Sequence, residues 1–193
     1  CTATASLLIA ACDDGPPPPV RVVSAEEIGL LGQSDAINGR DGGYSIHAWD
    51  RSIWVFGDTV LTVQDATGET WHHNSFSVTT DLDGADGIGG LTEPTDHAGG
   101  PIYLIPPTPE EEAFNALHRG DGCEDPCGAR WAAWPGEPVH DPESDRVIIP
   151  YGLIYAEPGD FNFHGVGSSF ALWDDYEAVP RRPVIDPEHE HPT

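Results

Sequence analysis

The 193-residue sequence contains no methionine and no lysine, and only 8 arginines oppose 33 acidic residues. The formal net charge of −25 repels phosphate backbones and anionic lipid headgroups, which argues against nucleic acid as a partner. Neutral glycans and cations are compatible with such a surface. Because the chain lacks an initiator methionine, we expect it to be a fragment of a longer protein.

Several functional motifs are also missing. The sequence has no serine nucleophile elbow, no phosphate-binding loop and no dinucleotide fingerprint. The glycine-rich stretch 84–90 carries an aspartate and no basic residue, so it does not suit phosphate. Disorder is disfavoured as well, because 6 Trp, 6 Phe and 5 Tyr can form a packed core.

Long helical patterns are scarce, and the chain after residue 20 reads as β. Short apolar runs alternate with clusters drawn from 22 Gly and 19 Pro, which predicts an all-β sandwich, barrel or propeller. The predicted strands cover 45–49, 53–56, 75–80, 102–105, 146–155 and 168–173. The predicted helices are 25–31 and 110–117, the second following a proline and opening with acidic residues.

A weak internal repeat favours the propeller. Residues 45–57 and 134–154 each read as a strand, an acidic turn containing Asp-Arg, and a second strand. Propeller blades repeat at roughly 40–50 residues. Two to three blades fit into the chain, so we expect 25–193 to form an incomplete β-propeller domain.

The beginning of the chain resembles a bacterial lipoprotein signal. An apolar run closes on Ala-Ala-Cys12, which predicts that 1–12 is a truncated signal peptide and that Cys12 carries a lipid. A proline-rich linker, 13–24, follows. The protein is then exported and touches the membrane only through its lipid anchor at the cell envelope. The alternative is a buried apolar segment followed by a loop.

Export permits disulfides, and Cys123 and Cys127 bracket a short glycine-rich loop. We predict a disulfide between them, with a stabilisation of about 2 kcal/mol because the closed loop is short. A zinc site is the alternative, but the histidines lie far away in the sequence.

The stretch 41–59 is the most informative part of the sequence. It reads as two strands joined by a turn at 50–52, so that Asp41 and Asp58 lie opposite each other at the outer ends. Sugar-cleaving sites need such a pair, because one carboxyl must hold a proton while the other stays ionised. Ordinary turn chemistry of Asp beside Gly is the alternative interpretation.

The sequence resembles the bacterial family called domain of unknown function 4185. The resemblance lies in Asp41, in the Phe-Gly-Asp-Thr run 56–59 and in the predicted strand 74–78. The resemblance covers about residues 35–175 and implies a five-bladed β-propeller related in shape to furanosidases. It also implies endo-D-arabinanase-like activity, since some members cleave mycobacterial cell-wall glycans. The acidic cysteine-containing insertion and the absence of later blades depart from the family pattern.

Three acids are candidate catalytic residues. Asp41 is the first choice for a nucleophile or base, and Asp58 either takes part in catalysis or tunes the pKa of its neighbour by like-charge repulsion. Glu137 begins the equivalent region of a later blade and is the candidate general acid; surface charge is its alternative. A carboxyl separation of roughly 5 Å implies retention, and one of roughly 6.5–9.5 Å implies inversion.

Other polar and aromatic residues carry two interpretations each. Sugar stacking competes with packing between blades for Trp49, Trp54, Trp131 and Trp134. For His47, a position in the central funnel competes with a role as a loop or core histidine. For His72 and His73, a metal or sugar site competes with the same role. The run 81–87 fails the EF-hand template and reads better as a polar turn, so we expect no cofactor, with a structural calcium ion as the only candidate.

The sequence therefore predicts an exported propeller that hydrolyses a furanose-containing polysaccharide or cell-wall glycan through paired carboxylates. The alternatives are a non-catalytic surface propeller that binds glycan or protein, and a structural lipoprotein whose acidity serves solubility.

Overall fold

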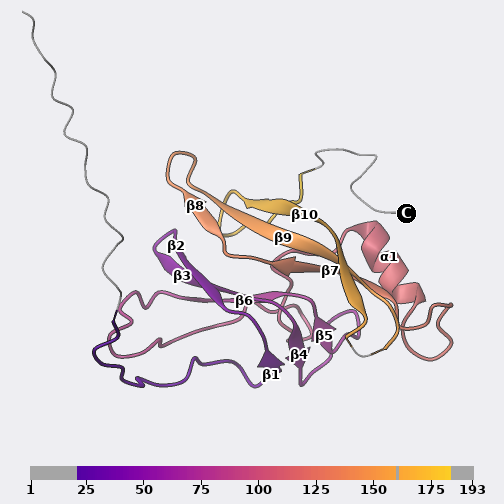
Figure 1. The fold of residues 1–193 in the computed structure, drawn as a ribbon, viewed down its shortest axis with the longest axis horizontal. Helices are drawn as coiled ribbons and strands as arrows, with labels where there is room; N and C mark the ends of the chain where they lie inside the picture. The colour runs from indigo at the N-terminus through magenta and orange to yellow at the C-terminus, as the bar shows by residue number, and fades with distance from the viewer. Residues whose placement is uncertain (1–20, 160, 184–193) are drawn as a thin grey trace, which may run out of the picture.

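The computed structural model describes residues 21–159 and 161–183, and this part of the chain is mostly antiparallel β-structure with a single α-helix (Figure 1). The all-β prediction is therefore confirmed. The strands are β1 (Ile37–Arg40), β2 (Tyr44–Ala48), β3 (Arg51–Phe56), β4 (Thr59–Leu61), β5 (Trp71–His72), β6 (Ser75–Thr79), β7 (Arg130–Pro135), β8 (Val139–Asp141), β9 (Arg146–Ala156) and β10 (Phe163–Trp173). The helix is α1 (Pro109–Leu117).

The strands form three antiparallel sheets. Their orders are β1-β4-β5, β2-β3-β6 and β10-β9-β7, with β8 also paired to β9. The first two sheets share one long hairpin, because β1 and β4 continue the pairing of β2 with β3 beyond a bend. The bend falls where 41–43 faces 57–58.

The tight turn of this hairpin lies one residue earlier than the sequence suggested. Ala48 pairs with Arg51, which leaves Trp49 and Asp50 as the two loop residues. Their φ angles of 51° and 54° are left-handed. Such a two-residue loop matches the right-handed twist of the flanking strands.

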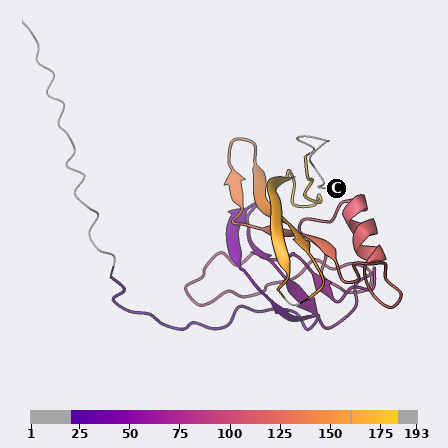
Figure 2. The ribbon, with the colours of Figure 1, turned by 45° about the vertical axis from the view of Figure 1, so that its right-hand side comes forward.

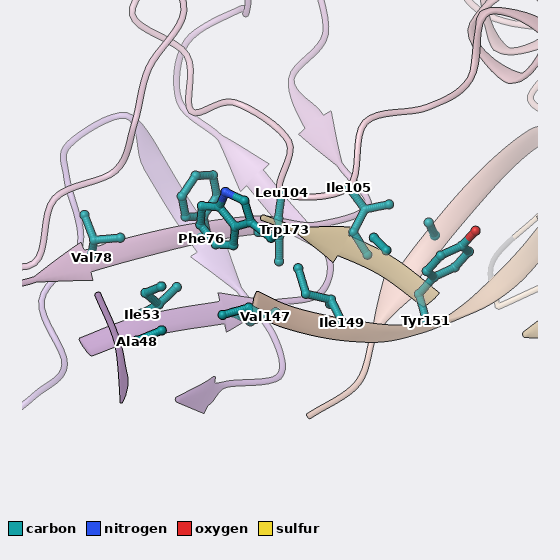
Figure 3. Close-up of a cluster of buried hydrophobic side chains, with 13 residues drawn as sticks. Ala48, Ile53, Phe76, Val78, Leu104, Ile105, Val147, Ile149, Tyr151 and Trp173 are labelled. Atoms are coloured by element: carbon teal, nitrogen blue, oxygen red, sulfur yellow. The ribbon is translucent and has the colours of Figure 1, made fainter. Parts of the chain in front are cut away.

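The main core lies between sheet β2-β3-β6 and the strands β9 and β10, as Figure 3 shows. Ile53 and Ile149 are fully buried, and the ring of Trp173 meets that of Phe76 edge-to-face at 5.4 Å. All five residues of β6 are buried. Strand β6 is therefore covered on both faces and holds the bent hairpin against the rest of the molecule.

The two hairpins of the sequence repeat lie side by side in both views (Figures 1 and 2). The indole N–H of Trp49, at the tip of the first, donates to the backbone oxygen of Asp145 at the tip of the second, at 3.3 Å. Trp49 also packs edge-to-face on Trp173. This tryptophan therefore packs between sheets.

Helix α1 agrees with the prediction for 110–117. Thr108 and Glu111 form a capping box, in which each side chain bonds the other residue's backbone N–H. The side chain of Asn115 pairs with both backbone groups of Trp131, which fixes the helix to the start of β7. No helix in the described ranges is both long and apolar enough to cross a membrane.

Two predicted elements are wrong. Residues 25–31 form no helix: they are exposed along their whole length, and Gly29 has a φ of 140°, which a helix does not allow (Figure 2). Residues 102–105 form a buried loop, in which the N–H of Ile105 donates to Asn74 Oδ1 at 2.9 Å. A side chain here supplies the acceptor that a neighbouring strand would otherwise provide.

Candidate functional site

The bend of the long hairpin brings Asp41 and Asp58 together. The N–H of Asp41 donates to the backbone oxygen of Asp58 at 2.9 Å, and the N–H of Gly57 donates to that of Asp41 at 3.0 Å. Gly42 and Gly43 adopt φ angles of 69° and 139°, which only glycine accepts readily. The sequence prediction that the two aspartates face each other across adjacent strands is therefore met in the backbone.

Gly57 makes room for the side chain of Asp41. A Cβ atom added to Gly57 would lie 2.5 Å from Asp41 Oδ1, closer than real Cβ contacts come. Asp41 itself is exposed to solvent. The missing side chain at position 57 thus sets where the Asp41 carboxylate sits.

Asp58 occupies a different environment, half-buried beside β7. The indole N–H of Trp134 donates to Asp58 Oδ1 at 2.9 Å. Burial raises the pKa of Asp58 to about 6, and the charge of Asp41 also raises it, against the opposing effects of the Trp134 hydrogen bond and of Arg130. The pair therefore combines an exposed carboxylate with a carboxyl that keeps its proton in mildly acidic solution.

Trp134 belongs to the third sheet, so the site joins two sheets that are distant in sequence. Its ring packs edge-to-face on Phe163 at 4.7 Å. A shallow groove of about 450 Å³ begins at Trp134 and continues past Tyr151, Ser168 and Phe170. Aromatic rings and hydroxyls in one groove are surfaces that sugar rings can contact.

Glu137, the third predicted acid, is exposed in the connection between β7 and β8. Among the described residues, no hydrogen bond joins it to Asp41 or Asp58. The Trp-Pro-Gly-Glu stretch does reach the carboxyl pair, but through Trp134. From the sequence alone, this tryptophan was predicted only to stack on sugar or to pack between blades.

Arg40 stabilises the strand that leads into the site, and no pattern in the sequence predicted this role. Its guanidinium lies 3.6 Å above the ring of Phe56 and bonds Glu93 at 3.2 Å and Ser77 Oγ at 2.7 Å. The side chains of Arg40 and Glu93 are only 5% and 1% exposed. This buried pair anchors the residue immediately before Asp41.

His72 and His73 are interior residues. His72 contacts Asp65 at 2.9 Å and stacks on Tyr103, and both histidines are almost fully buried. Burial lowers the pKa of His73 to about 4, so the ring is neutral and Nδ1 accepts from Asn74 at 2.7 Å. These histidines hold β5 and β6 against β7.

The carboxylates of Asp81 and Asp83, in the acidic run 81–87, accept hydrogen bonds from nearby backbone N–H groups. Asp81 accepts from the N–H groups of Asp83 and Gly89, and Asp83 accepts from that of Ala85. Across residues 21–159 and 161–183, no group of three or more His, Cys, Asp or Glu is arranged to hold a metal ion.

The cysteine predictions fall on two parts of the chain. Cys123 and Cys127 lie at disulfide distance, with Cα atoms 5.4 Å apart, as predicted. The signal peptide 1–12, Cys12 and the greater part of the linker 13–24 lie outside the described residues.

Comparisons with known proteins find little. No family model and no curated protein matches the sequence. Among solved structures, the chain is similar to a "putative hydrolase" from Bacteroides ovatus ATCC 8483, with a TM-score of 0.44 and 17% identity over 76% of this chain. The chain spans only 37% of that protein's length. Similarity at this level carries no functional information.

Proposed function

We propose that this protein is a glycoside hydrolase and that Asp41 and Asp58 are its catalytic residues. The observation that carries the proposal is the pair itself, in which facing backbone positions hold one exposed carboxylate and one half-buried carboxyl with a pKa of about 6. A half-buried carboxyl that holds its proton beside an exposed carboxylate can share the acid and base roles of glycosidic cleavage with it.

In this mechanism Asp58 is the general acid. Its proton passes to the glycosidic oxygen as the bond to the anomeric carbon breaks, and the Trp134 indole orients the carboxyl group. Asp41 acts on the anomeric carbon, either directly as a nucleophile or through a water molecule that it deprotonates. Mutual repulsion disfavours the doubly ionised pair and keeps one proton in the site.

We extend the proposal to the polysaccharide class and the architecture. The Asp41 and Phe-Gly-Asp-Thr pattern supports membership of the family called domain of unknown function 4185, and with it a five-bladed propeller and a furanose-containing cell-wall glycan as substrate. Three antiparallel sheets and adjacent hairpin tips are compatible with blades. Export as a lipoprotein anchored at Cys12 is part of the same proposal.

The test is incubation of the protein with arabinan, arabinogalactan and related furanose polymers, followed by analysis of released oligosaccharides. We expect products from the parent, with kcat/KM falling above about pH 6 as Asp58 loses its proton. Asp41→Asn should abolish release, whereas Asp50→Asn, at the opposite end of the same hairpin, should not. A folded parent that binds these polymers without cleaving them would instead establish a binding propeller.

Gly57→Ala tests the position of the Asp41 carboxylate. The added methyl group would meet Asp41 Oδ1 at 2.5 Å, so the carboxylate must move, and we expect hydrolysis to fall at least about tenfold. Gly39→Ala in the same hairpin is the matched control, because its Cβ would meet no atom within 4 Å. Equal activities of the two variants would contradict this geometry.

A further inference from the structure

A pocket of about 300 Å³ lies between β5, the start of β7, the end of α1 and the disulfide loop. Trp71, His73 and Tyr103 contribute aromatic rings to its lining, and Arg119 and Arg130 also line it. Two of the chain's 8 arginines therefore meet in one small cavity of a protein with a net charge of −25. The volume suits one or two sugar rings.

The two arginines differ in how their charges are used. Arg119 forms an ion pair with Glu69 and donates to the backbone oxygen of Thr67 at 3.2 Å. Arg130 lies 3.9 Å above the ring of Trp71 and forms no ion pair with any carboxylate of the described residues. Its position on an indole face leaves the N–H edge of the guanidinium available.

An arginine without a carboxylate partner is notable here, because acidic residues outnumber basic ones about fourfold (33 against 8). Ion pairs engage Arg40, Arg119, Arg146, Arg181 and Arg182. Arg130 is close enough to Asp58 for its charge to act on that carboxyl group. The pocket and the carboxyl pair are therefore electrostatically linked.

We propose that this pocket binds a sugar residue bearing one anionic group, a uronic acid carboxylate or a sulfate ester, with Arg130 as the ligand for that group. The inference rests on the proposed function, since the sugar would belong to the polysaccharide cleaved at Asp41 and Asp58. A planar guanidinium binds either oxyanion through two parallel N–H bonds, while Trp71 and Tyr103 contact the ring.

The overall charge limits the substrate further. A polymer with a charge on every residue would be repelled by the acidic surface, and Arg130 in the pocket would not offset this. A largely neutral chain with isolated anionic residues avoids that repulsion and still places one charge at Arg130. The substrate class is therefore a sparsely charged heteropolysaccharide.

The experiment is an NMR titration of the protein with methyl β-D-glucuronide, glucose 6-sulfate and neutral methyl β-D-glucoside, following the Trp71 indole and Arg130 side-chain resonances. We expect at least one anionic sugar to bind at least about tenfold more tightly than the neutral sugar, as charge-assisted hydrogen bonds predict. The glucuronide and the sulfate separate the two anion sources. Equal binding of all three sugars would overturn the proposal.

Arg130→Gln should reduce anionic-sugar affinity to that of the neutral sugar. Arg51→Gln is the matched control, because Arg51 also lies over an aromatic ring, at 4.2 Å from Tyr176, but does not line this pocket. Loss of affinity in both variants, or in neither, would contradict a specific role for Arg130.

Failure of this inference and failure of the hydrolase proposal can be told apart. Asp41→Asn should retain anionic-sugar binding while losing hydrolysis. Arg130-dependent binding in a parent without hydrolytic activity would leave the pocket assigned and refute the catalytic role. Hydrolysis with no preference for anionic sugars would support the catalytic role and refute the assignment of the pocket.

Discussion

Replacing Asp58 with asparagine is expected to abolish hydrolysis and to stabilise the folded protein at pH 7.5. Loss of a general acid costs about 10²–10⁴-fold in rate. The pKa of about 6, against an ordinary value of 3.8, means that ionised Asp58 opposes folding. After allowance for solvent screening at this half-buried site, asparagine should increase the free energy of unfolding by about 1–3 kcal/mol.

The sign of this effect depends on pH. Asp58 binds its proton more tightly in the folded state, so the parent loses stability as pH rises from about 4 to about 6 and not beyond. The advantage of Asp58→Asn should therefore be absent near pH 3.5 and complete above pH 7. Asparagine keeps an oxygen that can accept from the Trp134 indole.

Thermal unfolding of the parent and Asp58→Asn between pH 3.5 and 8 measures this difference. Asp50→Asn, an exposed aspartate in the same hairpin, is the matched control and should follow the parent at every pH. A variant no more stable than the parent at pH 7.5 would show that ionisation of Asp58 does not reduce the free energy of unfolding. A gain that did not vary with pH would assign the effect to something other than its charge.

Arg40→Met is expected to produce the largest loss of stability, about 3–5 kcal/mol. The substitution leaves Glu93, whose side chain is 1% exposed, as a buried charge without its cation. It also removes the bonds of Arg40 to Ser77 and to the backbone of Gly32. Urea unfolding at pH 7 measures the loss.

Arg146→Met is the comparison for this variant, because Arg146 and Asp174 form an ion pair whose side chains are 35% and 41% exposed. Exposed pairs contribute at most about 1 kcal/mol. Combining Arg40→Met with Glu93→Leu should restore much of the lost stability, since the unpaired buried charge is then gone. Equal losses in Arg40→Met and Arg146→Met would contradict a dominant role for burial.

Local signals in the sequence were sufficient for the helix and for the strands β2, β3, β6, β9 and β10. The helix after Thr108 follows from a capping residue, a proline and an acidic first turn, all within the five positions 108–112. The hairpin of β2 and β3 follows from alternation around a tight turn. The segment 25–31 has an apolar pattern, but its residues stay exposed, and without burial of one face that pattern does not form a helix.

The candidate site likewise has features set by local contacts and features set by long-range contacts. The pairing of Asp41 with Asp58 was predictable, because the register of one hairpin places its ends opposite each other. The contact with Trp134 was not, since it joins residues 76 positions apart. Nor was the exposure of Glu137, which depends on where the connection between β7 and β8 runs.

By itself the sequence determined the all-β class, the hairpin, its facing aspartates and the strong negative charge, because each depends on composition or on neighbours along the chain. Only the tertiary structure decided which acid is half-buried, which arginine has its charge neutralised, and which tryptophan becomes a hydrogen-bond donor. Burial and long-range contacts set these properties, and both arise only when sheets distant in sequence pack together.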